Sequence, residues 1–138
     1  MMLLGDSLAT VFFALAALHL YWALGGRAGL AMALPADGER PAFTPGRAIT
    51  FAVTIALLAC GSLLLGVSGL LALPVPASAQ RTPCILLAGV LALRAIGDRK
   101  WLGFTKRRKG SRFARWDTWV YSPLCCVLAL GIVVLLVP

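Results

Sequence analysis

Four long runs of hydrophobic residues cover most of the chain, and shorter polar stretches separate them. The runs lie at about residues 7–25, 48–73, 83–100 and 118–137. A helix needs about 20 apolar residues to cross a hydrocarbon core about 30 Å thick. The pattern therefore predicts four transmembrane helices.

The third run is the shortest. About thirteen residues separate Pro83 from Gly97, and Arg94 lies among them. We expect this helix to span the membrane if it continues past Gly97, or if Arg94 extends its guanidinium to the membrane surface.

Hydrophobic residues make up 60% of the 138 residues, whereas soluble domains contain about 45–50%. A soluble fold of this size would leave much of that apolar surface in water. We therefore expect an all-α integral membrane protein with one domain, residues 1–138. Because the polar stretches are short, the four helices are predicted to form an antiparallel up-and-down bundle.

Small residues recur along the second hydrophobic run, mostly three or four positions apart. Such spacing lets helix backbones approach closely inside a membrane. The face on which this helix packs is therefore predicted to contain Ala52, Ala56, Cys60, Ser62, Gly66 and Gly69.

Lys and Arg are distributed unequally among the polar stretches. The loop after the second run holds only Arg81, and the loop after the first holds Arg27, Arg40 and Arg47. The loop after the third run holds eight: Arg99, Lys100, Lys106, Arg107, Arg108, Lys109, Arg112 and Arg115. Cytoplasmic loops are richer in Lys and Arg than external ones. The first and third loops are therefore predicted to be cytoplasmic, with both termini outside.

Aromatic residues lie among the basic residues of the third loop, namely Trp101, Phe104, Phe113 and Trp116. This combination can bind single-stranded nucleic acid by phosphate contact and stacking. Helix ends flank the loop, however, so we expect it to lie against the anionic inner leaflet, where each basic residue contributes roughly 1 kcal/mol of attraction. Phospholipid headgroups are therefore the expected partners rather than nucleic acid. The expected contacts are Arg107, Arg108, Arg112 and Arg115.

Ionisable side chains within membrane spans are costly, so each is a candidate for a functional site. His19 lies about one turn before the end of the first predicted helix, and Trp22 follows it. His19 either hydrogen-bonds to a neighbouring helix or donates and accepts protons, because His titrates near neutral pH. Trp22 is typical of a membrane-interface anchor and is a candidate ligand contact.

Arg94 and Asp98 are four residues apart and would share one face of a continuous helix. In one interpretation they form an intrahelical ion pair that neutralises a charge near the membrane. In the other, Arg94 binds a phosphate or carboxylate headgroup and Asp98 orients it.

Asp117 and Tyr121 precede the last hydrophobic run. Asp117 is predicted to cap the N-terminus of the fourth helix, and Tyr121 to be an interface anchor. Under the predicted topology these residues lie at the same depth as His19, Arg94 and Asp98. The candidate catalytic residues are therefore His19, Asp98, Asp117 and Tyr121.

The four cysteines, at positions 60, 84, 125 and 126, form no C-x-x-C motif, and the chain has one histidine. This set does not provide the ligands of a zinc site. The sequence also lacks a phosphate-binding glycine loop, a nucleophile elbow and a dinucleotide fingerprint. It therefore predicts neither a metal nor a cofactor.

Three separated motifs resemble those of a known family. They are H-L-Y-W-A-L-G-G at 19–26, R-A-I-G-D at 94–98 and F-A-R-W-D-T-W-V-Y-S-P-L-C at 113–125. In type and order they are similar to those of a family of small bacterial four-span membrane proteins, domain of unknown function 3995. The resemblance covers nearly the whole chain. It implies a four-helix integral membrane protein and assigns no activity. The motif positions are His19, Trp22, Gly25, Gly26, Arg94, Gly97, Asp98, Asp117, Tyr121, Ser122 and Pro123.

These observations favour a non-enzymatic, multi-pass inner-membrane protein, either an accessory subunit or a lipid-associated protein. Its basic cytoplasmic face is expected to bind anionic headgroups, a membrane protein partner or a second copy of the chain. One alternative is an enzyme for an amphipathic anionic substrate, with His19 as acid or base, Arg94 on the head, and Asp98 or Asp117 orienting the site. A small proton-coupled exporter is less favoured, because no carboxylate lies in the middle of a predicted span.

Overall fold

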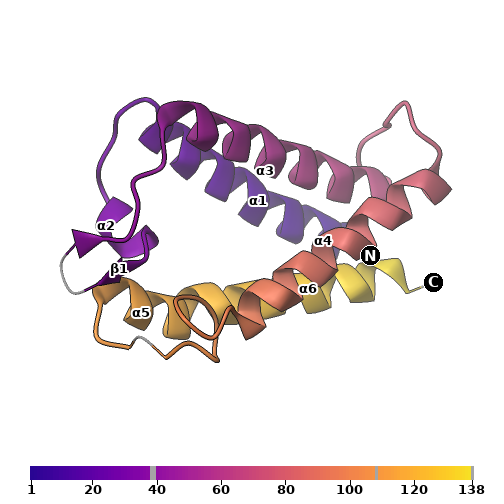
Figure 1. Ribbon diagram of the computed structural model, residues 1–138. Helices are drawn as coiled ribbons and strands as arrows, with labels where there is room; N and C mark the ends of the chain where they lie inside the picture. The colour runs from indigo at the N-terminus through magenta and orange to yellow at the C-terminus, as the bar shows by residue number, and fades with distance from the viewer. Residues whose placement is uncertain (38–39, 108, 138) are drawn as a thin grey trace.

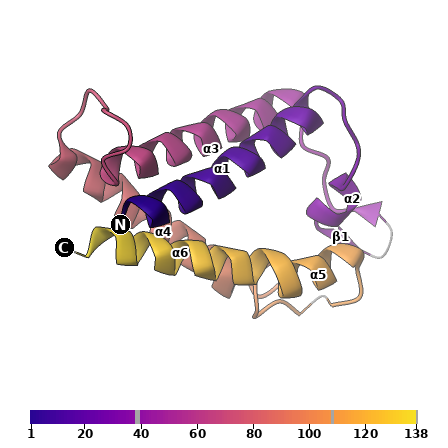
Figure 2. The ribbon, with the colours of Figure 1, turned by 180° about the vertical axis from the view of Figure 1, so that it is seen from behind.

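The structure is a computed structural model that describes residues 1–37, 40–107 and 109–137. The long helices are α1 (Met2–Ala23), α3 (Arg47–Val67), α4 (Ala77–Ile96) and a continuous helix made of α5 (Arg112–Trp116), η1 (Asp117–Tyr121) and α6 (Ser122–Leu136). Here η1 is a turn of π-helix. Successive long helices run in opposite directions, and both termini lie at the same end of the molecule (Figures 1 and 2).

All four long helices are long and apolar enough to cross a membrane, which confirms the prediction of four apolar helices of this length. The third helix, α4, begins at Ala77 and ends at Ile96, so it extends further toward the N-terminus than predicted. Pro83 therefore lies inside the helix rather than at its start, and the helix does not continue past Gly97. The helix α3 ends at Val67, earlier than predicted, and Gly69 follows with a φ of 78° that turns the chain.

The first loop contains the only short elements within the described ranges. They are α2 (Leu30–Ala33) and the two-residue strands β1 (Ala36–Asp37) and β2 (Arg40–Pro41), which pair antiparallel. The helix α2 contacts α5. The first loop thus connects the two halves of the molecule at the end opposite the termini, which we call the loop end.

The long helices form two pairs, α1 with α3 and α4 with α6. The pairs approach each other near the termini and diverge toward the loop end (Figures 1 and 2). The hydrophobic core lies where they approach, and its fully buried members include Phe12, Leu64 and Ile132. Apolar packing therefore holds the two pairs together near the termini, and other interactions are needed at the loop end.

The stripe of small residues predicted on the second span coincides only in part with the packed face of α3. Cys60 packs against the core, and Gly66 lies close to Leu73 and Gln80. Ala52 and Ala56 are exposed, whereas Thr50, Thr54 and Gly61 are buried. Both threonines donate hydrogen bonds to the backbone carbonyl four residues earlier, so their hydroxyls are satisfied within α3. Small size indicates that a residue can sit at an interface, but it does not identify which face of the helix packs.

Gly61 provides a test of the packing between α1 and α3. A Cβ at this position would lie 2.6 Å from the Phe13 ring, whereas a Cβ at Gly89 would meet no atom within 4 Å. Alanine improves helix propensity equally at both sites, so the difference between the two variants isolates packing. We expect Gly61→Ala to be less stable than Gly89→Ala by about 1–3 kcal/mol, measured by thermal unfolding in detergent. Equal stability of the two variants would contradict this packing.

Candidate functional site

The Asp117 carboxylate is the centre of a polar cluster at the loop end. Its side chain is 0% exposed. Oδ1 accepts a hydrogen bond from Arg94 Nη2 at 2.7 Å, and Oδ2 accepts from the Gly103 N–H at 2.8 Å and from Lys106 Nζ at 3.0 Å. A buried charge persists only when it is paired and hydrogen-bonded. Asp117 therefore joins α4, the third loop and the last span through one carboxylate.

Lys106 is a buried lysine whose hydrogen-bonding capacity is filled. Besides Asp117, its ammonium donates to the Gly103 carbonyl at 3.0 Å and to Thr118 Oγ1 at 2.6 Å. An ammonium has three donors and no acceptor, so all of its donors are used. Although the sequence places Lys106 in a run of basic loop residues, it is a structural cation and does not face lipid.

Two glycines allow the third loop to fold back onto the end of α4. Gly97 and Gly103 have φ values of 94° and 78°, and a Cβ on either one would collide with the backbone of the loop. The Phe104 and Thr105 N–H groups donate to the Ala95 and Ile96 carbonyls at 2.9 and 3.1 Å. This folding of the loop onto α4 places the Gly103 N–H and the Lys106 ammonium within hydrogen-bonding distance of Asp117.

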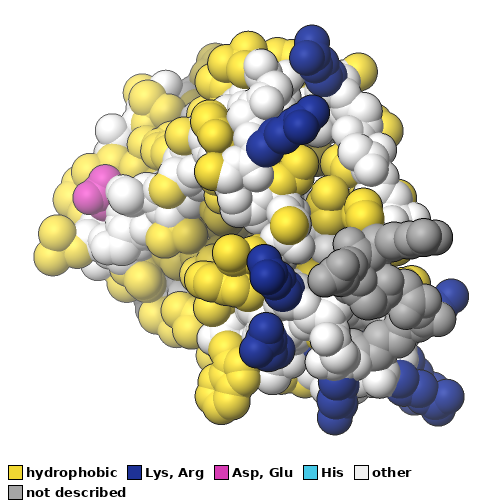
Figure 3. Space-filling model, turned by 90° about the vertical axis from the view of Figure 1, so that its left-hand side faces the viewer, with side chains coloured by type: hydrophobic (Ala, Val, Ile, Leu, Met, Phe, Trp, Pro, Cys, Tyr) yellow, Lys and Arg dark blue, Asp and Glu magenta, His cyan; other side chains and the backbone are white. Residues whose placement is uncertain are grey.

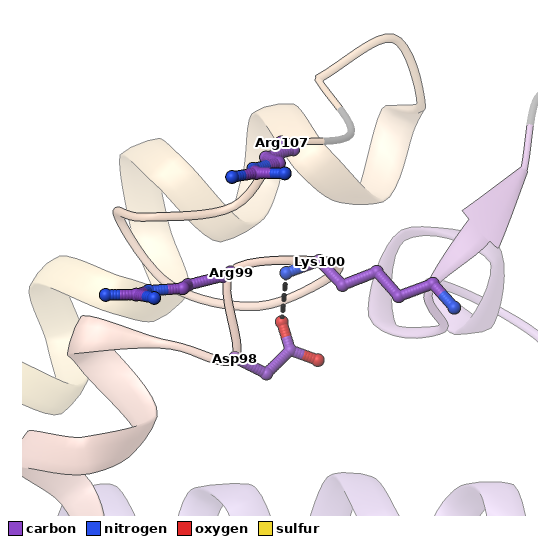
Figure 4. Close-up of a pocket in the computed structure, with 4 residues that line it drawn as sticks. All are labelled: Asp98, Arg99, Lys100 and Arg107. Carbon is purple, nitrogen blue, oxygen red and sulfur yellow. Dashed lines mark hydrogen bonds between the residues drawn. The ribbon is translucent and has the colours of Figure 1, made fainter.

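Asp98 stabilises the turn between Gly97 and Gly103. Its Oδ1 accepts hydrogen bonds from the N–H groups of Lys100, Trp101 and Leu102 at 2.7–2.9 Å, and Figure 4 shows the first of these. Burial alone would raise the pKa of the Asp98 carboxyl, but these donors lower it below its usual value of 3.8. Asp98 therefore stays ionised at neutral pH and holds the turn.

The predicted pairing of Arg94 with Asp98 is wrong. The helix α4 ends at Ile96 and Gly97 turns the chain, so the two side chains do not share a helical face. Arg94 pairs with Asp117 instead, 23 residues away in the sequence. The acid that orients Arg94 thus comes from the last span.

Asp117 does not cap the fourth helix, contrary to the prediction. The helix begins earlier, at Arg112, where Ser111 Oγ accepts a hydrogen bond from the Ala114 N–H at 3.1 Å. Asp117 starts η1, in which the Ser122 N–H donates to the Asp117 carbonyl five residues earlier. A turn of this kind brings residues five apart to the same side, and such turns are frequent at functional sites.

The π turn has two visible effects. Asp117 and Ser122 are both fully buried, and the rings of Trp116 and Tyr121 stack with centroids 6.4 Å apart. In each pair the residues are five positions apart. Tyr121, a candidate catalytic residue, therefore packs in an aromatic group with Trp116 and Phe113.

The cluster carries more positive than negative charge, since Arg94 and Lys106 surround one carboxylate. Among the described residues, Arg94 Nη1 and Ser122 Oγ are buried without a hydrogen-bond partner. Neither atom is accessible to solvent, so a ligand could reach them only if neighbouring side chains moved. In this conformation the cluster supports the loop, and the Arg94 side chain remains 27% exposed.

His19 and Trp22 lie on the other helix pair. His19 Nδ1 is 2.8 Å from the Leu15 carbonyl oxygen, and its ring meets the Trp22 ring edge-on at 5.0 Å. Trp22 Nε1 donates to the Ala28 carbonyl at 2.8 Å, which folds the first loop back onto α1. The contacts recorded for the described residues keep His19 within α1 and do not join it to Asp117.

Four arginines were predicted to contact ligand at the membrane surface. Arg107 is exposed in the third loop, and Arg112 and Arg115 are exposed on α5. Arg108 lies outside the described residues. Within those residues, no group of three His, Cys, Asp or Glu side chains is placed to hold a metal.

Sequence reasoning did not identify Lys106 and Gly103 as members of the cluster, and it noted Ser122 only as a motif position of the family resemblance. Lys106 is one of eight Lys or Arg residues in its loop, and neither spacing nor neighbours distinguish it. The only available signal was the presence of glycines at 97 and 103, which suits a close backbone return.

The Asp117 cluster can be tested by a double-mutant cycle. Asp117→Asn leaves two cations without their counter-charge and should lower stability by about 3–5 kcal/mol. Lys106→Met leaves the Arg94 pair intact and should cost less. We expect the double variant to be more stable than the two separate losses predict, by about 0.5–3 kcal/mol. Thermal unfolding in detergent measures all three variants, and strict additivity would contradict the arrangement.

Comparison with known proteins identifies a family for this chain. Residues 12–132 match a family described as protein of unknown function (DUF3995). No curated protein and no solved structure matches the chain. The matched segment contains Arg94, Gly103, Lys106 and Asp117, so the whole cluster lies inside it. Because the match covers most of the 138 residues, the chain belongs to this family of proteins of unknown function.

Proposed function

We propose that the protein is a non-enzymatic accessory protein of the bacterial cytoplasmic membrane that binds anionic phospholipid headgroups through its loop end. In this proposal the loop end faces the cytoplasm and both termini lie outside. One observation carries it. All but one of the exposed basic residues of the described chain lie at the loop end: Arg27, Arg47, Arg99, Lys100, Arg107, Lys109, Arg112 and Arg115. Figure 3 views this end and shows Lys and Arg side chains distributed around it.

The opposite end of the molecule is much less basic. Arg81, in the second turn of α4, is the exposed basic residue there. Such asymmetry favours the cytoplasm for the loop end. It also places the exposed cations where anionic headgroups attract them, within about a Debye length of the inner leaflet.

The enzymatic alternative has less support. It requires His19 to act on a substrate held by Arg94, with Asp98 or Asp117 orienting the site. Yet Arg94 and Asp117 bind each other, and Asp98 holds three backbone N–H groups. Each proposed catalytic group thus has a structural partner, which favours the binding role.

Headgroup binding predicts a loss of lipid when the exposed arginines of α5 are neutralised. Arg112→Gln with Arg115→Gln should lower the affinity for anionic phospholipid about fivefold per residue. Native mass spectrometry of the purified protein with added phosphatidylglycerol measures this loss. Arg81→Gln, at the opposite end, is the control and should change binding little. Equal effects of the control and the double variant would contradict the proposal.

The orientation predicts the behaviour of reporter fusions. Alkaline phosphatase fused after residue 137 should be active, because it requires the oxidising exterior. The same enzyme fused after residue 110 should be inactive, whereas a fluorescent protein there should fold and fluoresce. The reverse pattern would invert the proposed topology.

A further inference from the structure

The third loop contains a pocket whose lining residues are separate from the Asp117 cluster. The pocket has a volume of about 420 Å³ and is lined by Asp98, Arg99, Lys100 and Arg107. These residues include three cations and one carboxylate, so their side chains carry a net charge of +2. All four are exposed, which distinguishes them from Lys106 and Asp117.

The backbone holds the two arginines of the pocket together. The Arg107 N–H donates to the Arg99 carbonyl at 3.2 Å. This hydrogen bond joins the later part of the third loop to its first residues. Arg99 itself has a φ of 63°, the only non-glycine residue of the described chain in the left-handed region. The turn that Asp98 stabilises imposes this conformation, and the turn therefore fixes where the Arg99 side chain leaves the backbone.

The side chains point in different directions. In Figure 4 the side chains of Arg99 and Lys100 extend to opposite sides of the loop. The Lys100 ammonium lies 5.8 Å from the centre of the Trp101 ring. Arg99 and Arg107 both line the pocket and their backbones are hydrogen-bonded, so their guanidiniums are the lining groups best suited to an anion.

We propose that this pocket binds a phosphomonoester group through Arg99 and Arg107. Each guanidinium presents parallel N–H donors that match two phosphate oxygens. A phosphomonoester offers three terminal oxygens and a charge of about −1.5 to −2 at neutral pH, which complements the net charge of the lining. A phosphodiester offers only two free oxygens and one negative charge. It can therefore accept fewer hydrogen bonds from the two guanidiniums.

This proposal rests on the proposed function and deepens it, because it assigns one class of headgroup to a defined site. Asp98 acts as a positioning residue that holds the turn, and the buried Asp117 cluster anchors the loop through the Gly103 N–H and Lys106. The phosphomonoester can belong to a lipid such as phosphatidic acid or to a soluble phosphate ester. Both sources share the same chemistry at the guanidiniums.

The experiment compares two lipids on the purified full chain in detergent. Native mass spectrometry with dioleoyl phosphatidic acid and dioleoyl phosphatidylglycerol measures the affinity for each. We expect phosphatidic acid to bind about tenfold more tightly. Arg99→Asn combined with Arg107→Gln should abolish this preference. Asn tolerates the left-handed backbone at position 99, and circular dichroism of the variant checks that its helices are retained.

The control is Arg112→Gln with Arg115→Gln, which removes the same charge outside the pocket. It should weaken both lipids equally and keep the preference for phosphatidic acid. Equal binding of the two lipids by the unmodified chain would overturn the proposal, and so would a preference that survives the Arg99 and Arg107 changes. An unchanged affinity in the control would instead count against the proposed function alone.

Addition of millimolar glycerol phosphate identifies the source of the phosphomonoester. Displacement of phosphatidic acid supports a soluble phosphate ester as the ligand. Retention of phosphatidic acid supports a lipid whose acyl chains add to the binding. In either case the preference for a monoester must depend on Arg99 and Arg107.

Discussion

Burial of the Asp117 carboxylate is the constraint on which the loop end depends. A charge removed from water must be compensated by donors and counter-charges within the protein. Arg94, Lys106 and the Gly103 N–H provide this compensation, and each comes from a different part of the third helix and its loop. The conformation of the loop, the close approach of Gly97 to Gly103 and the π turn all follow from bringing these donors to one carboxylate.

The two ends of the molecule use different interactions. Near the termini, apolar side chains from all four long helices pack around Phe12, Leu64 and Ile132. Toward the loop end the helix pairs diverge, and there hydrogen bonds and ion pairs hold the structure together instead. Lipid gives helices little hydrophobic reason to associate, so a buried polar network supplies specificity where apolar packing ends.

The four spans could be predicted because each depends on a local property, the length of an apolar run. The ends of α4 could not, because Pro83 favours a helix start locally while the surrounding helix accommodates it. The partner of Arg94 could not be predicted from the sequence either. Asp98 lies at the helical spacing that suggests pairing, but Gly97 ends the helix and the true partner is 23 residues away. His19 was grouped with Asp117 only because both were predicted to lie at the same depth in the membrane. Residues at the same depth can belong to different helix pairs, as these two do.

The order of the cluster along the chain bears on how the protein is made. Arg94 and Lys106 precede Asp117, and a chain emerges from the ribosome starting at its N-terminus. Asp117 is the only acidic residue between Arg112 and Leu136. Both counter-charges are therefore present before the last span is complete. The preceding helix and its loop therefore offer Asp117 its two counter-charges as soon as this residue is synthesised.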